Sequence, residues 1–223
     1  HVHVLSTVHV EYNVDCIADG VGGWRNYGVD PSTFPRTLMA TCERMVHEGR
    51  FRPQAPASVI EDSYQELMQQ KMPLIGSSTA CIVSLHREER TIYTANLGDS
   101  GYLLIRDNQV VHRSQEQQHY FNTPYQLSVV PPKEAYVDKN CINPDMAESN
   151  SHAVEEGDII LLGTDGLFDN MTDMMLVEYV SKLKVSITSD QYHFSFIIVK
   201  VHEVKNNIEF QQFLITRLNW CVL

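Results

Sequence analysis

The chain of 223 residues is long enough for one large domain or two small ones, and its 43% apolar and 20% charged residues are typical of a globular protein. A formal net charge of −11 argues against a nucleic-acid partner, because binding to phosphates requires a basic surface. No segment approaches the ~18 continuous apolar residues of a membrane span, and five widely spaced cysteines without a CxxC pair argue against a zinc site or a disulfide framework.

The first ten residues, HVHVLSTVHV, alternate with the period of a β-strand. Their three histidines, His1, His3 and His9, could be a metal cluster, but a terminal strand with one polar face is the simpler interpretation. The segment lacks the basic and apolar regions of a signal peptide and the arginine-rich character of a transit peptide. Cys16 follows in a second apolar run, and Cys81 lies in a later one; both are most simply core thiols.

Two amphipathic helices are predicted next. Residues 33–49 end at Gly49, a suitable glycine for the end of a helix, and residues 57–70 are followed by Pro73. Their apolar stripes are Phe34, Leu38, Cys42, Met45 and Val46 in the first helix, and Ile60, Tyr64, Leu67 and Met68 in the second.

Short β-rich segments follow over residues 76–86, 91–98, 101–113 and 157–166, and Asp107-Asn108 is typical of a hairpin turn inside the third. A last helix is predicted over 173–184, with Leu176, Tyr179, Val180 and Leu183 on one face. Because helices and strands are segregated along the chain, we expect an α+β domain of packed layers.

Three of the predicted strands end in an aspartate flanked by glycine: Asp19, Asp99 and Asp165, with Asp169 four residues beyond the last. Any one of these pairs is most simply a turn. Three strand ends of this kind can meet at one edge of a sandwich, where the carboxylates repel one another unless a cation neutralises them. Oxygen ligands suit hard ions such as Mg²⁺ or Mn²⁺, which retain several waters.

Four motifs in this order, ADGVGGW (18–24), GSSTACIV (76–83), ANLGDSG (95–101) and TDGLFDNM (164–171), resemble the metal-dependent serine/threonine phosphatases of type 2C, the PPM family. The segments GWRNYGVDPSTF, LMATCERMV and EQQHYFNTPYQLS are similar to its mitochondrial, PTC-seven-type branch. The resemblance begins at about residue 13, so we expect a phosphatase-like domain over 1–184 and a non-matching tail over 185–223.

The resemblance implies an α+β fold: a four-layer β-sandwich of two antiparallel sheets flanked by helices, which we expect to be incomplete in this chain. It also implies two Mn²⁺ or Mg²⁺ ions and hydrolysis of phosphoserine and phosphothreonine by a metal-activated hydroxide. The residue matching Asp19 bridges the metals, that matching Gly20 offers its backbone carbonyl, and that matching Asp165 is a direct ligand. Those matching Asp99 and Asp169 act in the outer shell or at a weaker third metal. Phosphoprotein substrates, a monomer and a mitochondrial location are further expectations.

The chain departs from the family in three places. Val21 stands where many members have a histidine proposed as general acid, and HVHVLSTVHV stands where an acidic Gly-Glu/Asp-Asp-Ala motif is expected. The last forty residues lack the Asp-Asp/Asn strand motif that supplies another ligand; Asp190, the only aspartate there, has no matching context. We therefore expect weak activity, and a catalytically impaired pseudophosphatase or binding variant remains the alternative.

Two other features of the sequence, a pair of arginines and a polar-aromatic stretch, each allow two interpretations. Arg25 or Arg36 could bind substrate phosphate through its guanidinium fork, whereas surface salt links are the simpler interpretation. The stretch around His119 and Tyr120 either covers the substrate or is a packed surface loop. In the tail, FSFIIVKVHEV (194–204) has strong strand propensity and could fill the strand position left by the missing motif.

Overall fold

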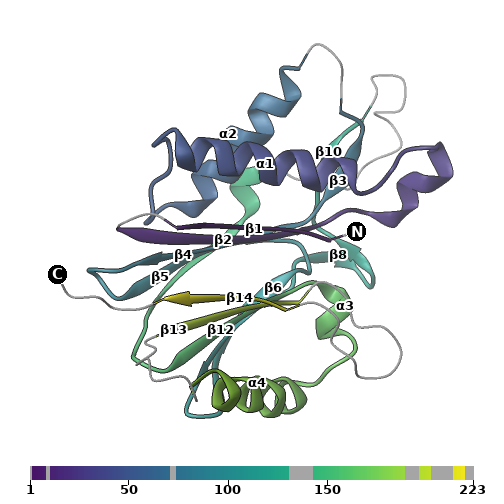
Figure 1. The fold of residues 1–223 in the computed structure, drawn as a ribbon. Helices are drawn as coiled ribbons and strands as arrows, with labels where there is room; N and C mark the ends of the chain where they lie inside the picture. The colour runs from purple at the N-terminus through teal and green to yellow at the C-terminus, as the bar shows by residue number, and fades with distance from the viewer. Residues whose placement is uncertain are drawn as a thin grey trace.

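The computed structural model describes residues 2–8, 11–70, 74–130, 143–188, 196–201 and 213–218. Two five-stranded sheets lie face to face between helices (Figure 1). The first sheet has the order β1 (Val2–Val8), β2 (Tyr12–Asp19), β4 (Ala80–His86), β5 (Thr91–Leu97) and β11 (Glu148–Ala153). The second has the order β14 (Phe213–Leu218), β13 (Phe196–Val201), β12 (Asp158–Gly163), β6 (Gly101–Arg106) and β7 (Gln109–Arg113).

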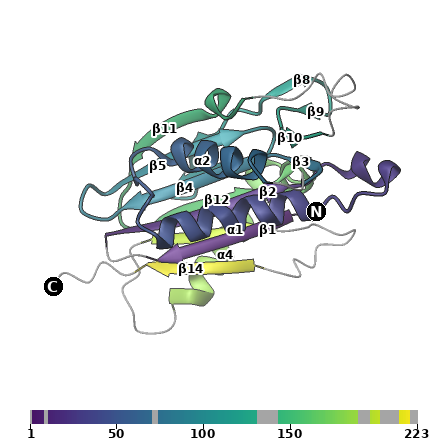
Figure 2. The ribbon, with the colours of Figure 1, turned by 90° about the horizontal axis from the view of Figure 1, so that it is seen from above.

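Smaller elements complete the described chain. Two short ribbons pair β3 (Gly76–Ser78) with β10 (Leu127–Val129) and β8 (Gln118–Tyr120) with β9 (Thr123–Pro124). The helices are η1 (Gly22–Tyr27), α1 (Thr33–His47), α2 (Pro56–Met68), η2 (Pro144–Met146), α3 (Asp165–Phe168) and α4 (Asp173–Thr188). Seen from above, α1 and α2 lie across the first sheet (Figure 2), while α4 covers the opposite side of the molecule (Figure 1). Among the described helices, none is long and apolar enough to cross a membrane.

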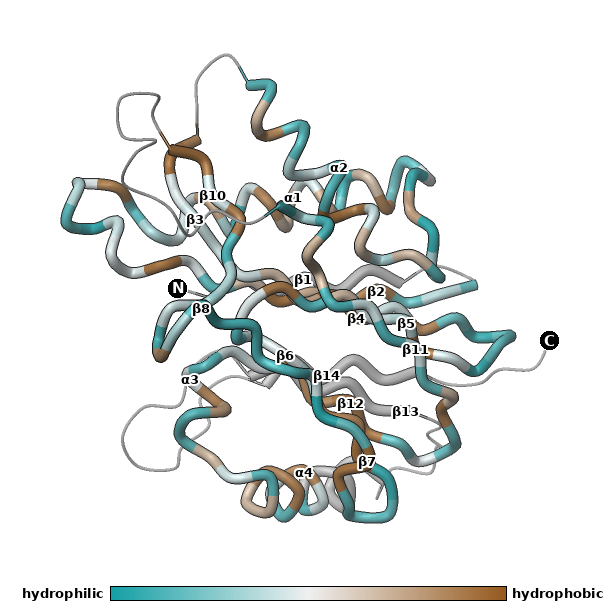
Figure 3. Tube along the Cα trace, turned by 180° about the vertical axis from the view of Figure 1, so that it is seen from behind, coloured by the Kyte–Doolittle hydropathy of each residue, from teal (hydrophilic) through white to brown (hydrophobic). Residues whose placement is uncertain are grey.

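Three buried apolar layers hold these elements together, and strand alternation assigns residues to them. On β2, Val14, Cys16 and Ala18 pack toward α1 and α2, whereas Ile17 packs between the sheets. On β12, Ile160 and Leu162 also lie between the sheets, and the residues next to them pack toward α3 and α4. The hydropathy-coloured trace shows apolar segments in the strands and in the faces of the helices (Figure 3). The predicted α+β sandwich is therefore confirmed.

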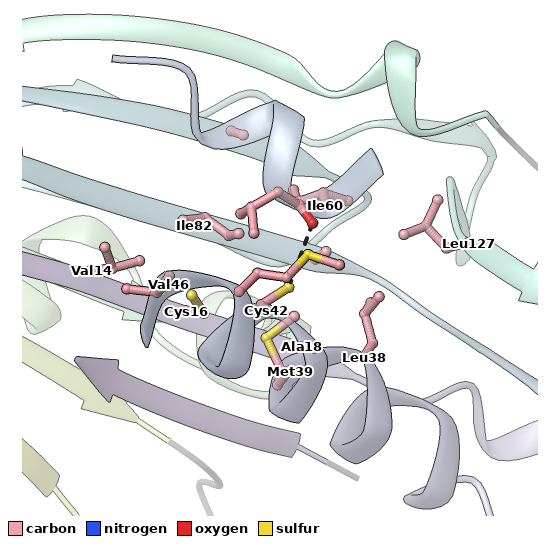
Figure 4. Close-up of a cluster of buried hydrophobic side chains, with 14 of the residues drawn as sticks. Val14, Cys16, Ala18, Leu38, Met39, Cys42, Val46, Ile60, Ile82 and Leu127 are labelled. Atoms are coloured by element: carbon pink, nitrogen blue, oxygen red, sulfur yellow. Dashed lines mark hydrogen bonds between the residues drawn. The ribbon is translucent and has the colours of Figure 1, made fainter. Parts of the chain in front are cut away.

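The first layer contains the predicted stripe of α1. Phe34, Leu38, Cys42, Met45 and Val46 are all buried there. Figure 4 shows Cys42 among Val14, Cys16 and Ile82, with its Sγ 3.9 Å from the Val59 carbonyl oxygen. Cys16, Cys42 and Cys81 are buried, as expected for core residues, and burial raises the pKa of Cys42 to about 11.

Local signals in the sequence were accurate at most helix ends and turns. Gly49 follows α1 with a positive φ of 72°, and Asp107 and Asn108 have φ values of 50° and 60°, as a type I′ hairpin requires. One residue of the apolar stripe predicted for the second helix, Met68, is not buried. Met68 is 51% exposed because it is the last residue of α2, beyond the turn that packs on the sheet.

The termini give mixed outcomes. The alternation at the start of the chain forms strand β1, but His1 and His9 lie outside the described residues. In the tail, residues 196–201 form β13 and pair with β12, so the predicted strand occupies that position in the second sheet. The pairing is parallel, whereas every other pair in the two sheets is antiparallel. The connection through α4, a crossover on one face of the sheet, permits this direction.

Candidate metal centre

Asp19 is the last residue of β2, and β3 and Thr79 hold its backbone. The Asp19 amide donates to Thr79 Oγ1 at 3.1 Å, and the Thr79 amide donates to the Asp19 carbonyl oxygen at 3.0 Å. A further bond joins the Val21 amide to the Ser77 carbonyl oxygen at 3.1 Å. Gly20 and Ser78 between these bonds form an isolated bridge. In such a non-hydrogen-bonded pair the Gly20 carbonyl points away from β3.

Gly20 also sits in a confined place. A Cβ at this position would lie 1.9 Å from the carbonyl oxygen of Pro31, so a side chain cannot be accommodated without moving backbone. By contrast, Gly22 and Gly23 would place a Cβ in open space. Of these three glycines, Gly20 is therefore the one that packing requires.

Asp99 lies between β5 and β6, at the same end of the sandwich. Gly98 before it has a φ of 106°, and its amide donates to Gln117 Oε1 at 3.2 Å. The Gln117 amide returns a bond to the Gly98 carbonyl oxygen at 2.9 Å. The segment that carries Asp99 is thus fixed against the irregular segment that leads into β8, and Asp99 itself is only 6% exposed.

Asp165 begins the short helix α3, directly after β12. Its Oδ1 accepts a bond of 2.6 Å from the Gly166 amide, and its carbonyl oxygen accepts one of 2.8 Å from the Asp169 amide. This turn places Asp169 on the exposed side of α3, while Asp165 is half-buried.

These carboxylates interact electrostatically. Burial, followed by the negative charge of Asp165, raises the pKa of Asp99 to about 7; Asp19 and Asp169 add to the effect. Burial and the neighbouring Asp19 raise the pKa of Asp165 as well. Such upward shifts indicate negative charge without enough compensation, which is the environment that a bound cation relieves.

The three acids at the strand ends line one open pocket. Its lining is Asp19, Gly20, Val21, Gly22, Gly23, Arg25, Thr79, Asp99, Asn122, Pro124 and Asp165. The sequence prediction that Asp19, Asp99 and Asp165 meet is therefore confirmed geometrically, and Asp169 adds its charge from just outside the lining. Arg25 lines the pocket and Arg36 does not.

The rim of the pocket includes the β8–β9 ribbon, which lies with α3 at one end of the sandwich (Figure 1). At its tip Tyr120 and Phe121 are 67% and 96% exposed. The stretch around His119 is therefore not a fully packed loop, and two of its residues, Asn122 and Pro124, face the pocket.

The donor set fits a hard divalent cation only in part. The acidic groups of the pocket offer oxygen atoms alone, and Mg²⁺ or Mn²⁺ binds through few carboxylates while keeping waters. Among the described residues, however, no group of three His, Cys, Asp or Glu side chains is gathered closely enough to hold an ion. The oxygen donors therefore match the chemistry of these ions, whereas the described side chains do not form a ready-made ligand group.

Sequence reasoning missed the hydroxyl groups behind the acids. Thr79 Oγ1 lies 2.6 Å from Ser100 Oγ, and Trp24 Nε1 donates to Ser77 Oγ at 2.6 Å. The run GSST in the second motif contained the signal, but hydroxyl residues in a strand have many ordinary uses.

Comparison with a model of the Stage II sporulation protein E (SpoIIE) family gives a match over residues 28–193, most of the chain. Protein phosphatase PTC7 homolog of Danio rerio is 59% identical over 176 residues, covering 79% of this chain and 59% of the relative. The Homo sapiens PTC7 homolog is 58% identical over 178 residues, covering 80% and 58%. The chain spans slightly more than half the length of these curated relatives.

Solved structures agree with the fold. The photosystem II phosphatase PBCP superposes with a TM-score of 0.69 at 28% identity, covering 81% of this chain and 65% of that structure. The serine/threonine phosphatase of S. agalactiae has a TM-score of 0.55 at 17% identity, with 84% and 85% covered, and supports the fold alone. Because the family model matches most of its length, this chain belongs to the SpoIIE/PP2C family of type 2C phosphatase domains, and PTC7 homologs are among its relatives.

Proposed function

We propose that the protein hydrolyses phosphoserine and phosphothreonine in phosphoprotein substrates at the pocket formed by the three strand ends. One observation supports this most: Asp19, Asp99 and Asp165, far apart in sequence, line a single pocket together with Arg25. Acids alone would attract only cations, whereas the guanidinium adds a group suited to phosphate oxygens. The names of the PTC7 relatives agree with this reaction class.

We propose that Asp19, the Gly20 carbonyl and Asp165 hold two Mn²⁺ or Mg²⁺ ions. Asp99 and Asp169 act in the outer shell of these ions or at a weaker third metal. The upward pKa shifts of Asp99 and Asp165 and the place of Gly20 in the pocket lining support this assignment. When bound, such ions activate a water and stabilise the charge of the transferring phosphoryl group.

The chain's own residues have separable tasks in this proposal. Arg25 binds and orients the phosphate, because it is the only cationic side chain among the described residues that line this pocket. Val21, also in the lining, has no proton to donate, so the proton for the leaving serine or threonine oxygen comes from water. The described tail strands, FIIVKV and FLITRL, contain no acid and add no carboxylate.

Hydrolysis of a phosphoserine peptide in millimolar Mn²⁺ tests the proposal. We expect a low but measurable rate, since losing outer groups of a metal site commonly costs ~10–100-fold. Asp19→Ala should abolish it. As a matched control, Asp62→Asn removes a carboxylate from the exposed face of α2 and should leave the rate unchanged. Full activity in Asp19→Ala would exclude this pocket as the catalytic site.

The cellular setting is proposed on resemblance only. The PTC7-type relationship favours a mitochondrial protein that acts on phosphoproteins there, and we propose a monomer. The acidic net charge of −11 agrees with a partner other than nucleic acid.

A further inference from the structure

Two buried hydroxyl groups lie directly behind the acids of the pocket. Thr79 joins β3 to β4, and Ser100 joins β5 to β6. The two side chains are 2% and 1% exposed, and their oxygens lie 2.6 Å apart. This contact links two segments that are 21 residues apart in sequence and that border Asp19 and Asp99 respectively.

Thr79 contacts both acid-bearing segments. Its Oγ1 accepts the Asp19 amide and its own amide donates to the Asp19 carbonyl, so both backbone groups of Asp19 bond to one residue. On the other side, a Cβ at Gly98 would lie 2.6 Å from Thr79 Cγ2, which shows how closely the Thr79 methyl packs on the backbone before Asp99.

The donors and acceptors around Thr79 Oγ1 show why the two hydroxyl groups bond to each other. Because Thr79 Oγ1 already accepts the Asp19 amide, its own proton is available for Ser100 Oγ, or it accepts a second bond from Ser100. Because Thr79 and Ser100 are almost fully buried, removing one hydroxyl leaves the other group without its hydrogen-bond partner.

We propose that the Thr79–Ser100 hydroxyl pair is a positioning link that fixes the spacing between the Asp19 and Asp99 segments, and thereby the affinity of the pocket for its cations. The proposal rests on the function proposed above. The link opposes the mutual repulsion of the carboxylates, which would otherwise separate the strand ends. Thr79 and Ser100 are positioning residues: neither needs to touch the substrate.

Calorimetric titration of the full chain with Mn²⁺ tests the link. Thr79→Val keeps the shape and removes the hydroxyl, and should weaken Mn²⁺ binding ~10–100-fold, the usual cost of losing an outer-shell partner. Ser100→Ala should weaken it in the same direction. Thr79→Ser restores the hydroxyl and should bind Mn²⁺ more tightly than Thr79→Val.

Thr94→Val is the matched control, because Thr94 is 1% exposed and its hydroxyl lies 3.0 Å from the Tyr102 hydroxyl, yet it does not line the pocket. It should lose stability without losing Mn²⁺ affinity. Wild-type affinity in Thr79→Val, or an equal loss of affinity in Thr94→Val, would overturn the proposal.

A metal-free measurement separates this proposal from the proposed function. Amide hydrogen exchange at Asp19 should accelerate in Thr79→Val by more than the loss of global stability explains, whereas in Thr94→Val it should change only with global stability. If the wild-type chain binds no Mn²⁺, the proposed metal centre fails, and the link then depends on this exchange alone. Unchanged protection of the Asp19 amide in Thr79→Val would refute it.

Discussion

At position 20, packing alone requires a glycine. Its missing Cβ leaves room for the Pro31 carbonyl oxygen, which would lie 1.9 Å from such an atom. We therefore predict that Gly20→Ala lowers the free energy of unfolding by about 1–3 kcal/mol, the usual cost of overpacking. Urea denaturation of the metal-free protein measures this change without any contribution from bound ions.

Gly22→Ala provides the control at the same scale. Gly22 lines the same pocket, its Cβ would meet nothing within 4 Å, and alanine favours helical backbone over glycine. This variant should keep or slightly raise the free energy of unfolding. Equal destabilisation by both substitutions would mean that backbone freedom, rather than the approach of Pro31, explains the glycines of this loop.

At the scale of elements, a histidine pair joins the two sheets along one edge. His112 on β7 and His152 on β11 have ring centroids 4.0 Å apart, and His152 Nε2 lies 3.1 Å from the Tyr102 hydroxyl. Burial lowers the pKa of both histidines, the charge of His112 lowers that of His152 further, and Glu148 opposes these shifts. The folded protein therefore favours neutral imidazoles at this edge.

The sign of the pH dependence follows from these shifts. Because the folded-state pKa values lie below the unfolded value of 6.5, the unfolded chain binds protons that the folded chain does not. The stabilising contribution is complete above about pH 6.5 and is lost as the pH falls toward the lowered folded values. We predict that His112→Phe reduces the loss of unfolding free energy between about pH 7 and pH 5.

Urea denaturation at a series of pH values measures this slope. His47→Gln, on the exposed surface of α1, is the control and should leave the slope as it is in the wild type. A slope unaffected by His112→Phe would assign the acid sensitivity to other groups.

For the whole molecule, the sequence predicted what local patterns determine. The apolar or β-rich runs of β2, β5 and β12 predicted strands that lead into Asp19, Asp99 and Asp165. The meeting of these three acids was predictable because strand ends can converge at one edge of a sandwich. The hydroxyl link was not predictable, because a contact between Thr79 and Ser100 depends on how separate strands pack. The parallel pairing of β13 with β12 was not predictable either. Strand propensity does not distinguish parallel from antiparallel pairing.

A remaining question is whether residues 185–223 belong to the folded unit. The sequence analysis expects them to be a tail that does not match the family. Because the tail does not match the family, the sequence predicts that a protease cuts within 185–223 before it cuts within 13–184. The strand pairing allows a sharper test. All six residues of β12 pair with β13, and β13 in turn pairs with β14. Removing residues 202–223 would leave β13 as the sheet edge, whereas removing 189–223 would expose the buried strand DIILLG of β12.

We predict that the two truncations differ in aggregation. An exposed apolar edge strand pairs readily with other chains, so the chain ending at residue 188 should scatter light at lower temperature than the full chain. The chain ending at residue 201 should fall between them, because β13 still satisfies the backbone groups of β12. Heating the three proteins at equal concentration in a light-scattering instrument ranks them. If the shortest chain were as resistant as the full chain, β13 would contribute nothing to the sheet, and the core would end at α4.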